Sequence, residues 1–199
     1  MIFDTHSHYD DHQYDTDREA VLASLVGCNV TAVTNISADM ESVMTTTALA
    51  RKYDFIYATV GVHPDGTETL TEDDMETLKG LVMEDRESGR HRIVAIGEIG
   101  LDYYWEKDAE KRLLQQRVFV RQLDLARQLH LPVCIHDREA HGDTLAILKK
   151  EARGMTGVLH CFSGSWEMAQ EVLRMGWYFG VDGPLTYKKA AKLPEIVQK

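Results

Sequence analysis

Short apolar runs alternate with longer amphipathic segments along almost the whole chain. The apolar runs, rich in β-branched residues, predict strands, and the amphipathic segments between them predict helices. Such an alternation is typical of βαβ units, in which helices join parallel strands. The predicted strands lie at residues 1–4, 30–36, 55–61, 92–97, 131–136, 156–160 and 177–181.

Two of the helices can be placed from their side-chain patterns. One helix is predicted to begin at Thr71, whose hydroxyl can cap the helix while Asp74 serves as the capping-box partner. The segment after Asp108 has one apolar helical face, and its charged side chains fall elsewhere. That apolar face comprises Leu114, Val118, Leu125 and Leu129.

Seven strands at a spacing of about 30 residues predict a TIM-type (β/α) barrel, with an open doubly wound sheet as the alternative. A complete barrel has eight units in about 250 residues. Because the same spacing puts an eighth strand just past residue 199, we expect the chain to be short by the last βα unit. No linker-like segment interrupts the series, so we interpret residues 1–199 as a single domain.

Composition narrows the classes of function. Hydrophobic residues make up 44% of the chain, which is enough for one core, but no apolar run approaches the roughly 20 residues of a bilayer-spanning helix, so no membrane partner is expected. The net charge of -10 repels phosphate polyanions, so a nucleic-acid role would depend on local cations. Three cysteines without a C-x-x-C pair indicate a reducing compartment, and we expect a cytoplasmic monomer.

Histidines and one glutamate lie where four of the predicted strands end. His6 and His8 follow the first strand and point the same way in an extended backbone. Glu98 follows a Val/Ile-rich run, where a buried carboxylate needs a cation or a hydrogen-bond network. His136 and His160 end two later strands. Singly, each histidine is compatible with an ordinary loop residue and Glu98 with a structural salt bridge, but together they predict a site for zinc, manganese, iron or magnesium.

Other candidates are less specific. Cys134 lies two residues before His136 and so on the same strand face, as an extra ligand or, alternatively, a buried inert thiol. His63 ends a further predicted strand, where it could bind a substrate oxyanion or support the ligands. The remaining histidines are interpreted as surface residues. They are His12, His91, His130 and His141.

The motifs around these residues resemble the TatD family of metal-dependent hydrolases. The resemblance runs through residues 3–9, 61–64, 96–104, 132–140, 160–165 and 180–189, in the family's order. It implies a barrel with a divalent-metal centre that cleaves phosphodiester bonds, typically trimming DNA from the 3′ end, with RNA as a further substrate of some members. By that resemblance, the ligands of two divalent ions (Zn, Mg or Mn) would be His6, His8, Glu98, His136 and His160.

The same resemblance assigns further roles and shows two departures. Glu98 would bridge the two ions and be required for catalysis, while His63 and Arg138 would contact the substrate phosphate. Asp65 stands where many relatives have a second histidine. The family's final motif, a strand that ends in Glu-Thr-Asp and supplies a metal-binding aspartate, has no match here, and Asp182 is the only nearby acid.

We therefore expect a metal-dependent phosphodiester hydrolase, a 3′–5′ deoxyribonuclease that acts on the ends of DNA or RNA with a metal-activated water. Two alternatives remain open. One is an amidohydrolase-like ester or amide hydrolase, such as an aminoacyl-tRNA deacylase. The other is an inactive, truncated form that binds metal without turnover.

Overall fold

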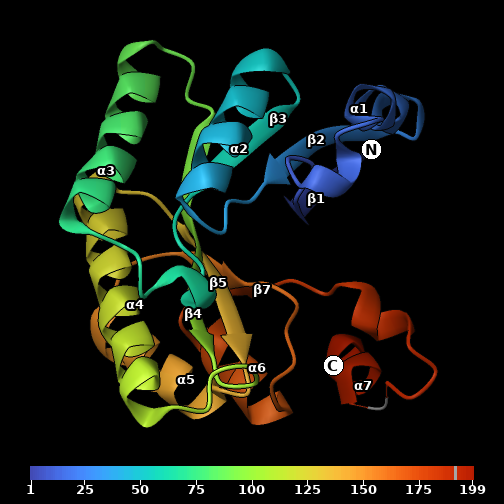
Figure 1. The fold of residues 1–199 in the computed structure, drawn as a ribbon. Helices are drawn as coiled ribbons and strands as arrows, with labels where there is room; N and C mark the ends of the chain where they lie inside the picture. The colour runs from blue at the N-terminus through green and yellow to red at the C-terminus, as the bar shows by residue number, and fades with distance from the viewer. Residues whose placement is uncertain (191) are drawn as a thin grey trace.

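Seven parallel strands form one curled sheet in the computed structural model, which describes residues 1–190 and 192–199 (Figure 1). Each strand pairs in parallel with the next, so that β1 and β7 are the two edges. The sequential order confirms the barrel-type α/β fold, because a doubly wound sheet reverses its strand order. The strands are β1 (Ile2–Ser7), β2 (Val30–Asn35), β3 (Ile56–Val60), β4 (Ile93–Asp102), β5 (Val133–Arg138), β6 (Gly157–Leu159) and β7 (Tyr178–Phe179).

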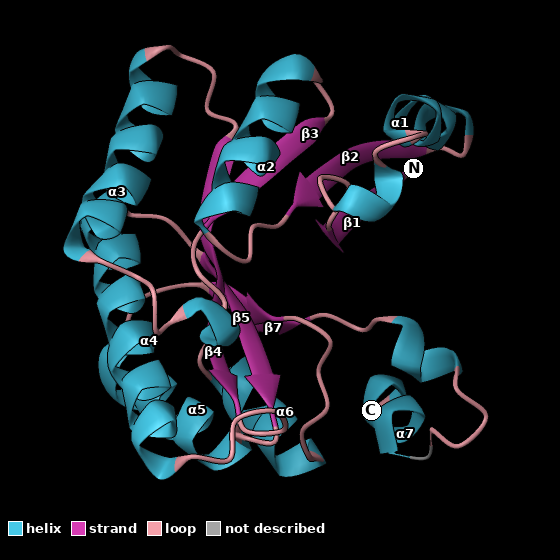
Figure 2. Cartoon of the chain, in the orientation of Figure 1, coloured by secondary structure: helices cyan, strands magenta, loops and turns pink. Residues whose placement is uncertain are grey.

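Helices cover the outer side of the curled sheet (Figure 2). No helix among the described residues is long and apolar enough to cross a membrane. The α-helices are α1 (Arg18–Gly27), α2 (Met40–Lys52), α3 (Glu72–Glu87), α4 (Ala109–Leu129), α5 (His141–Glu151), α6 (Trp166–Arg174) and α7 (Lys192–Gln198). Short 3-10 helices follow three of the strands, at η1 (His12–Tyr14), η2 (Pro64–Gly66) and η3 (Gly183–Thr186).

The two helix starts agree with the sequence pattern. Thr71 caps α3 in a reciprocal capping box with Asp74. Asp108 caps α4 by accepting hydrogen bonds from the first-turn backbone N–H groups of Glu110 and Lys111. The predicted apolar face of α4 packs inward, with Leu114 half-buried at its start. Its fully buried members are Val118, Leu125 and Leu129.

Strand β4 is longer than its sequence pattern indicates. Its predicted end is residue 97, but the strand continues to Asp102 and carries Glu98 within it. The glycines make this possible: a Cβ on Gly97 would lie 2.7 Å from Cβ of Cys134, so only glycine lets β4 pass this close to β5. Conversely, β6 ends at Leu159, and His160 follows the strand instead of ending it.

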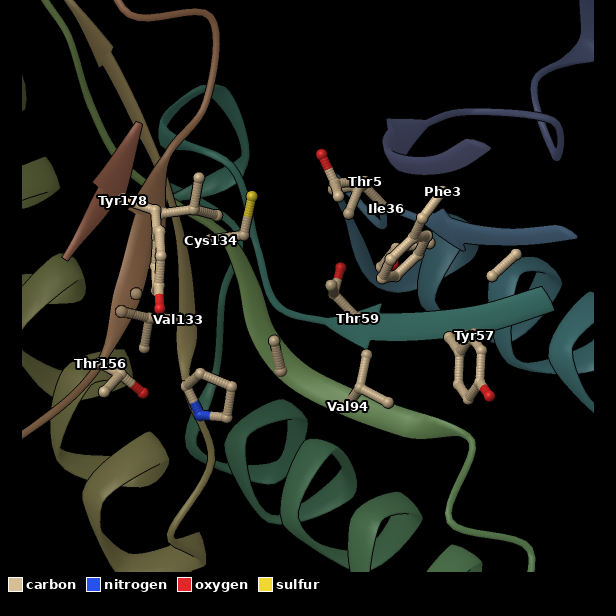
Figure 3. Close-up of a pocket in the computed structure, with 16 residues that line it drawn as sticks. Phe3, Thr5, Ile36, Tyr57, Thr59, Val94, Val133, Cys134, Thr156 and Tyr178 are labelled. Carbon is tan, nitrogen blue, oxygen red and sulfur yellow. The ribbon is translucent and has the colours of Figure 1, made fainter. Parts of the chain in front are cut away.

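The inner face of the sheet encloses a cavity of about 590 Å³ (Figure 3). Its lining comes from the strands themselves and is mainly apolar and threonine side chains. Cys134, near the amino end of β5, lies where the cavity meets the polar site, because its Sγ is 3.6 Å from Nδ1 of His6. The polar site described next lies at the carboxyl-terminal ends of the strands, where barrel folds place their active sites.

Candidate metal centre

Glu98 is the centre of the site and is held within the sheet. Its side chain is 5% exposed, and its backbone N–H donates to the carbonyl of Ser37 at 2.9 Å. Strand β4 lies between β3 and β5, so the carboxylate is surrounded by protein. A buried carboxylate costs free energy unless charged or polar groups compensate it.

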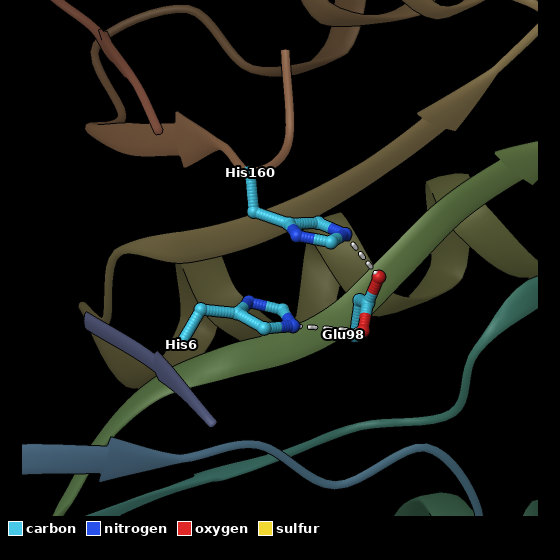
Figure 4. A group of neighbouring side chains, drawn as sticks. All are labelled: His6, Glu98 and His160. Carbon is cyan, nitrogen blue, oxygen red and sulfur yellow. Dashed lines mark ion pairs between the residues drawn. The ribbon is translucent and has the colours of Figure 1, made fainter. Parts of the chain in front are cut away.

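Four imidazoles supply that compensation, and they divide between the two carboxylate oxygens of Glu98. Oε2 lies 3.4 Å from Nε2 of His6 and 3.9 Å from Nε2 of His8. Oε1 lies 2.7 Å from Nδ1 of His136 and 2.5 Å from Nε2 of His160. Figure 4 shows the rings of His6, from β1, and His160, which follows β6, pointing at Glu98 from the same side. The two rings are stacked at 3.8 Å between centroids.

The protonation of this cluster follows from its contacts. Burial alone would raise the pKa of Glu98, but the contacts with His136, His160 and His6 hold that pKa well below its usual range. Burial lowers the pKa of His6. For His160 burial acts in the same direction, but Asp182 and Glu98 outweigh it and raise the pKa to about 9. Glu98 is therefore ionised, in a cluster that attracts positive charge.

Two observations show that these side chains fit a metal ion. Nε2 of His6 and Nε2 of His8 point at each other across 3.2 Å, which aims two nitrogen lone pairs at one region. Nδ1 of His160 is buried and has no hydrogen-bond partner among the described residues, although Oδ2 of Asp182 is 3.5 Å away. Buried polar atoms are rarely left unpaired, and neutral imidazoles with a carboxylate are the donors that zinc and related ions prefer.

A second group of possible ligands adjoins the first. His63, Asp102 and His136 bring one nitrogen or oxygen atom each to within 4.8 Å of one another. Asp102 is 1% exposed, and its Oδ2 lies 3.1 Å from Nε2 of His136. The sequence analysis missed Asp102. Its position in the sequence, four residues after Glu98, could have identified it, because both side chains lie on one face of the strand if the strand continues.

The remaining predicted residues surround this cluster. The ring of His63 packs edge-on against His136, with centroids 4.3 Å apart, and its Nδ1 is 3.4 Å from Oδ2 of Asp65. The hydrogen bond with His63 lowers the pKa of Asp65. Arg138 is exposed at the end of β5, and its guanidinium lies over the ring of Tyr104 at 4.0 Å.

Two side chains outside the predicted ligand set are buried or half-buried and contact the residues around the site. His141, interpreted above as a surface residue, is half-buried, and its Nδ1 lies 2.6 Å from Oδ2 of Asp137. That hydrogen bond raises the pKa of His141. Cys134 is buried, and burial together with Glu98 raises the pKa of its thiol well above the usual range.

Known proteins are similar to this chain in sequence and in fold. The profile of a family described as TatD related DNase matches residues 3–199. The chain belongs to the TatD family. It is 39% identical over 200 residues to the uncharacterized metal-dependent hydrolase YabD of Bacillus subtilis, covering 100% of the chain and 75% of that TatD-family relative. It is 33% identical over 183 residues to the 3′–5′ ssDNA/RNA exonuclease TatD of Cronobacter sakazakii, covering 92% of the chain and 66% of that protein.

A solved structure in the TatD family confirms the architecture. The crystal structure of YjjV, a TatD homologue from Escherichia coli, superposes with a TM-score of 0.88 at 32% identity, over 100% of the chain and 74% of that protein. The chain thus spans about three quarters of the length of these relatives. By family the chain is a metal-dependent hydrolase, and the predicted resemblance is confirmed.

Proposed function

We propose that the chain is a divalent-metal-dependent phosphodiesterase that trims single-stranded DNA or RNA from the 3′ end. The observation that carries this proposal is the division of four imidazoles between the two oxygens of one buried carboxylate. The name of the Cronobacter relative, 3′–5′ ssDNA/RNA exonuclease, supports the choice of substrate.

The residues present could hold two divalent ions. His6 and His8 would hold one and His136 and His160 the other, with the Glu98 carboxylate shared between the two pairs. Four imidazoles favour Zn²⁺ over Mg²⁺ and Mn²⁺, which prefer oxygen ligands. Such a pair of ions supplies an activated water and stabilises charge on the attacking and leaving oxygens of a phosphodiester.

The side chains around the ions orient the substrate and the ligands. Asp102 holds the His136 ring by accepting a hydrogen bond from its far nitrogen, as carboxylates commonly do behind metal-bound histidines. Asp182 occupies the corresponding place beside His160. His63 and Arg138 contribute positive or hydrogen-bonding groups for the phosphate, which the overall charge of -10 would otherwise repel.

The test is hydrolysis of a 5′-labelled single-stranded oligonucleotide by metal-loaded protein. Trimming from the 3′ end gives a ladder of labelled products that shorten one nucleotide at a time. Glu98→Gln keeps the shape of the side chain but removes its charge, so we expect it to lose metal and cleavage together. Glu76→Gln, at an exposed position on α3, is the matched control and should retain both.

Two outcomes would overturn the proposal. One is absence of DNA and RNA cleavage with Zn²⁺, Mn²⁺ and Mg²⁺ alike, while an ester or amide substrate is hydrolysed. The other is cleavage by Glu98→Gln at the wild-type rate in metal-replete buffer.

A further inference from the structure

Exposed aromatic side chains lie directly beside the candidate metal centre. Tyr104 is 40% exposed and Trp105 is 66% exposed, and both follow the end of β4. Their rings meet edge to face with centroids 4.7 Å apart. Large aromatic side chains normally bury their faces, so two neighbouring exposed ones mark a candidate contact surface.

A cation covers one side of this aromatic pair. The guanidinium of Arg138 lies 4.0 Å from the centroid of Tyr104 and 5.6 Å from that of Trp105. Among the described residues no carboxylate forms an ion pair with Arg138, so its charge remains available to a ligand. The Nζ of Lys107 also lies 5.6 Å from the Tyr104 centroid, but it pairs with Glu139 at 3.8 Å, so Arg138 supplies the cation of this surface.

Trp105 also lines a small cavity that carries a different charge. This cavity has a volume of about 140 Å³, and carboxylates of Asp65, Glu68 and Glu106 line it together with Lys111. Carboxylates repel phosphate but can accept hydrogen bonds from the amino groups of a nucleobase. The surface therefore offers its cationic side to a phosphate and its aromatic and acidic side to a base.

The aromatic pair is rigidly coupled to the metal centre. Oδ1 of Asp102 accepts hydrogen bonds from the backbone N–H groups of Tyr104 and Trp105, at 2.9 Å and 3.0 Å. Oδ2 of the same carboxylate contacts His136. One carboxylate thus links the backbone of Tyr104 and Trp105 to a candidate ligand, so a base stacked on their rings would belong to a nucleotide near the cleaved phosphate.

We propose that Tyr104, Trp105 and Arg138 form a stacking ledge for one unpaired nucleobase of the single-stranded substrate. The inference rests on the proposed function and adds to it the basis of strand selection. Bases in a duplex have their faces covered by neighbouring base pairs, whereas the bases of a single strand are free to stack on protein rings. Because every base has a π-face, the ledge selects single strands without selecting sequence.

The experiment compares two variants and two oligonucleotides. Trp105→Ala removes the exposed ring. Tyr57→Ala is the matched control, because the guanidinium of Arg92 lies 5.3 Å from the centroid of the Tyr57 ring. Tyr57 is near the amino end of β3. The substrates are an all-thymidine single strand and the same strand with stable abasic residues at its two 3′-terminal positions. Kinetics are measured with metal-loaded protein of verified metal content.

Stacking of one base contributes about 1–3 kcal/mol, so we expect Trp105→Ala to raise KM for the intact strand by roughly 5–150-fold. The abasic strand should show a similarly raised KM with the wild type and no further increase with Trp105→Ala, because the stacking partner is already absent. Tyr57→Ala should behave as the wild type on both strands.

An unchanged KM for Trp105→Ala on the intact strand would overturn the ledge while leaving the phosphodiesterase intact. An equal further increase of KM on the abasic strand would also overturn it, because the effect would then not depend on a base. If the wild type cleaves neither the intact strand nor the abasic strand, the result would instead contradict the proposed function itself.

Discussion

The carboxylate of Asp102 holds the imidazole of His136 from the side opposite Glu98. Oδ2 of Asp102 lies 3.1 Å from Nε2 of the ring, and Oε1 of Glu98 lies 2.7 Å from Nδ1. Both carboxylates are buried. One imidazole between two buried carboxylates has a fixed ring plane, which is the orientation that a metal ligand requires.

We therefore predict that Asp102→Asn weakens metal binding about 10–100-fold, the usual effect of removing such a partner. The asparagine Oδ1 can still accept the hydrogen bonds from Tyr104 and Trp105, so the turn after β4 should be retained. The measurement is a chelator competition for Zn²⁺, with circular dichroism to show that the variant is folded. Wild-type affinity in the folded variant would exclude this role for Asp102.

Metal binding should also stabilise the fold, because the candidate ligands come from four separated parts of the chain. A ligand that binds only the folded state at 100 times its Kd adds about 2.7 kcal/mol. For a chain of this size that corresponds to an increase in Tm of roughly 5–10 °C. Differential scanning fluorimetry with and without Zn²⁺ measures the shift. Glu98→Gln should lose most of the shift, and an equal shift in that variant would place the ion elsewhere.

The three cysteines should react at very different rates. Cys28 is exposed. Burial, with Asp182 and Glu98, raises the pKa of Cys161 to about 11, and burial and Glu98 raise that of Cys134 well above its usual range. A raised pKa keeps a thiol protonated below that pKa, and only the thiolate is a good nucleophile.

At pH 8 we therefore expect one fast thiol per folded chain in a titration with Ellman's reagent. Cys28→Ser should remove the fast phase, and guanidinium chloride should expose the slow thiols. With iodoacetamide in place of Ellman's reagent, the reaction of Cys161 should accelerate as the pH rises toward 11. Two fast thiols at pH 8 would contradict the assignment.

Two glycine substitutions should have opposite effects on stability. A Cβ on Gly100 would fall on the backbone carbonyl of His136, and its φ of +146° disfavours any other residue. We expect Gly100→Ala to lower the free energy of unfolding by about 3 kcal/mol or more, or to make the protein insoluble. Gly80, within α3, has nothing within 4 Å of an added Cβ. Gly80→Ala should therefore raise the free energy of unfolding by about 0.5–1 kcal/mol. Urea unfolding of both variants measures these changes.

The sequence pattern located all seven strands because buried parallel strands are continuous apolar runs. It shortened β4 because Gly97, Glu98, Gly100 and Asp102 are typical of a loop when considered one by one. Their true role depends on contacts with β5, where glycine is needed for close approach and the acids meet imidazoles from other strands. Such contacts arise only after the sheet has formed, so periodicity does not reveal them.

Much of the candidate site was predictable for a simple reason. Carboxyl ends of parallel strands meet at one edge of a sheet, so polar residues after several strands converge. The sequence does not predict which neighbour a side chain contacts. Arg138 follows His136 by two residues, but its position over Tyr104 depends on where β4 ends. The role of Asp102 was hidden for the same reason, because burial distinguishes it from an ordinary loop acid.

The stacked rings of His6 and His160 have a consequence for the time at which the site is completed. About 150 residues separate the two histidines in the chain, and ribosomes add about 5–20 residues per second. The first histidines are therefore made on the order of ten seconds before their partner. During that interval His6 has no His160 ring to stack against, and the candidate metal centre lacks one of its imidazoles. Completion of the candidate centre therefore waits for the segment that follows β6.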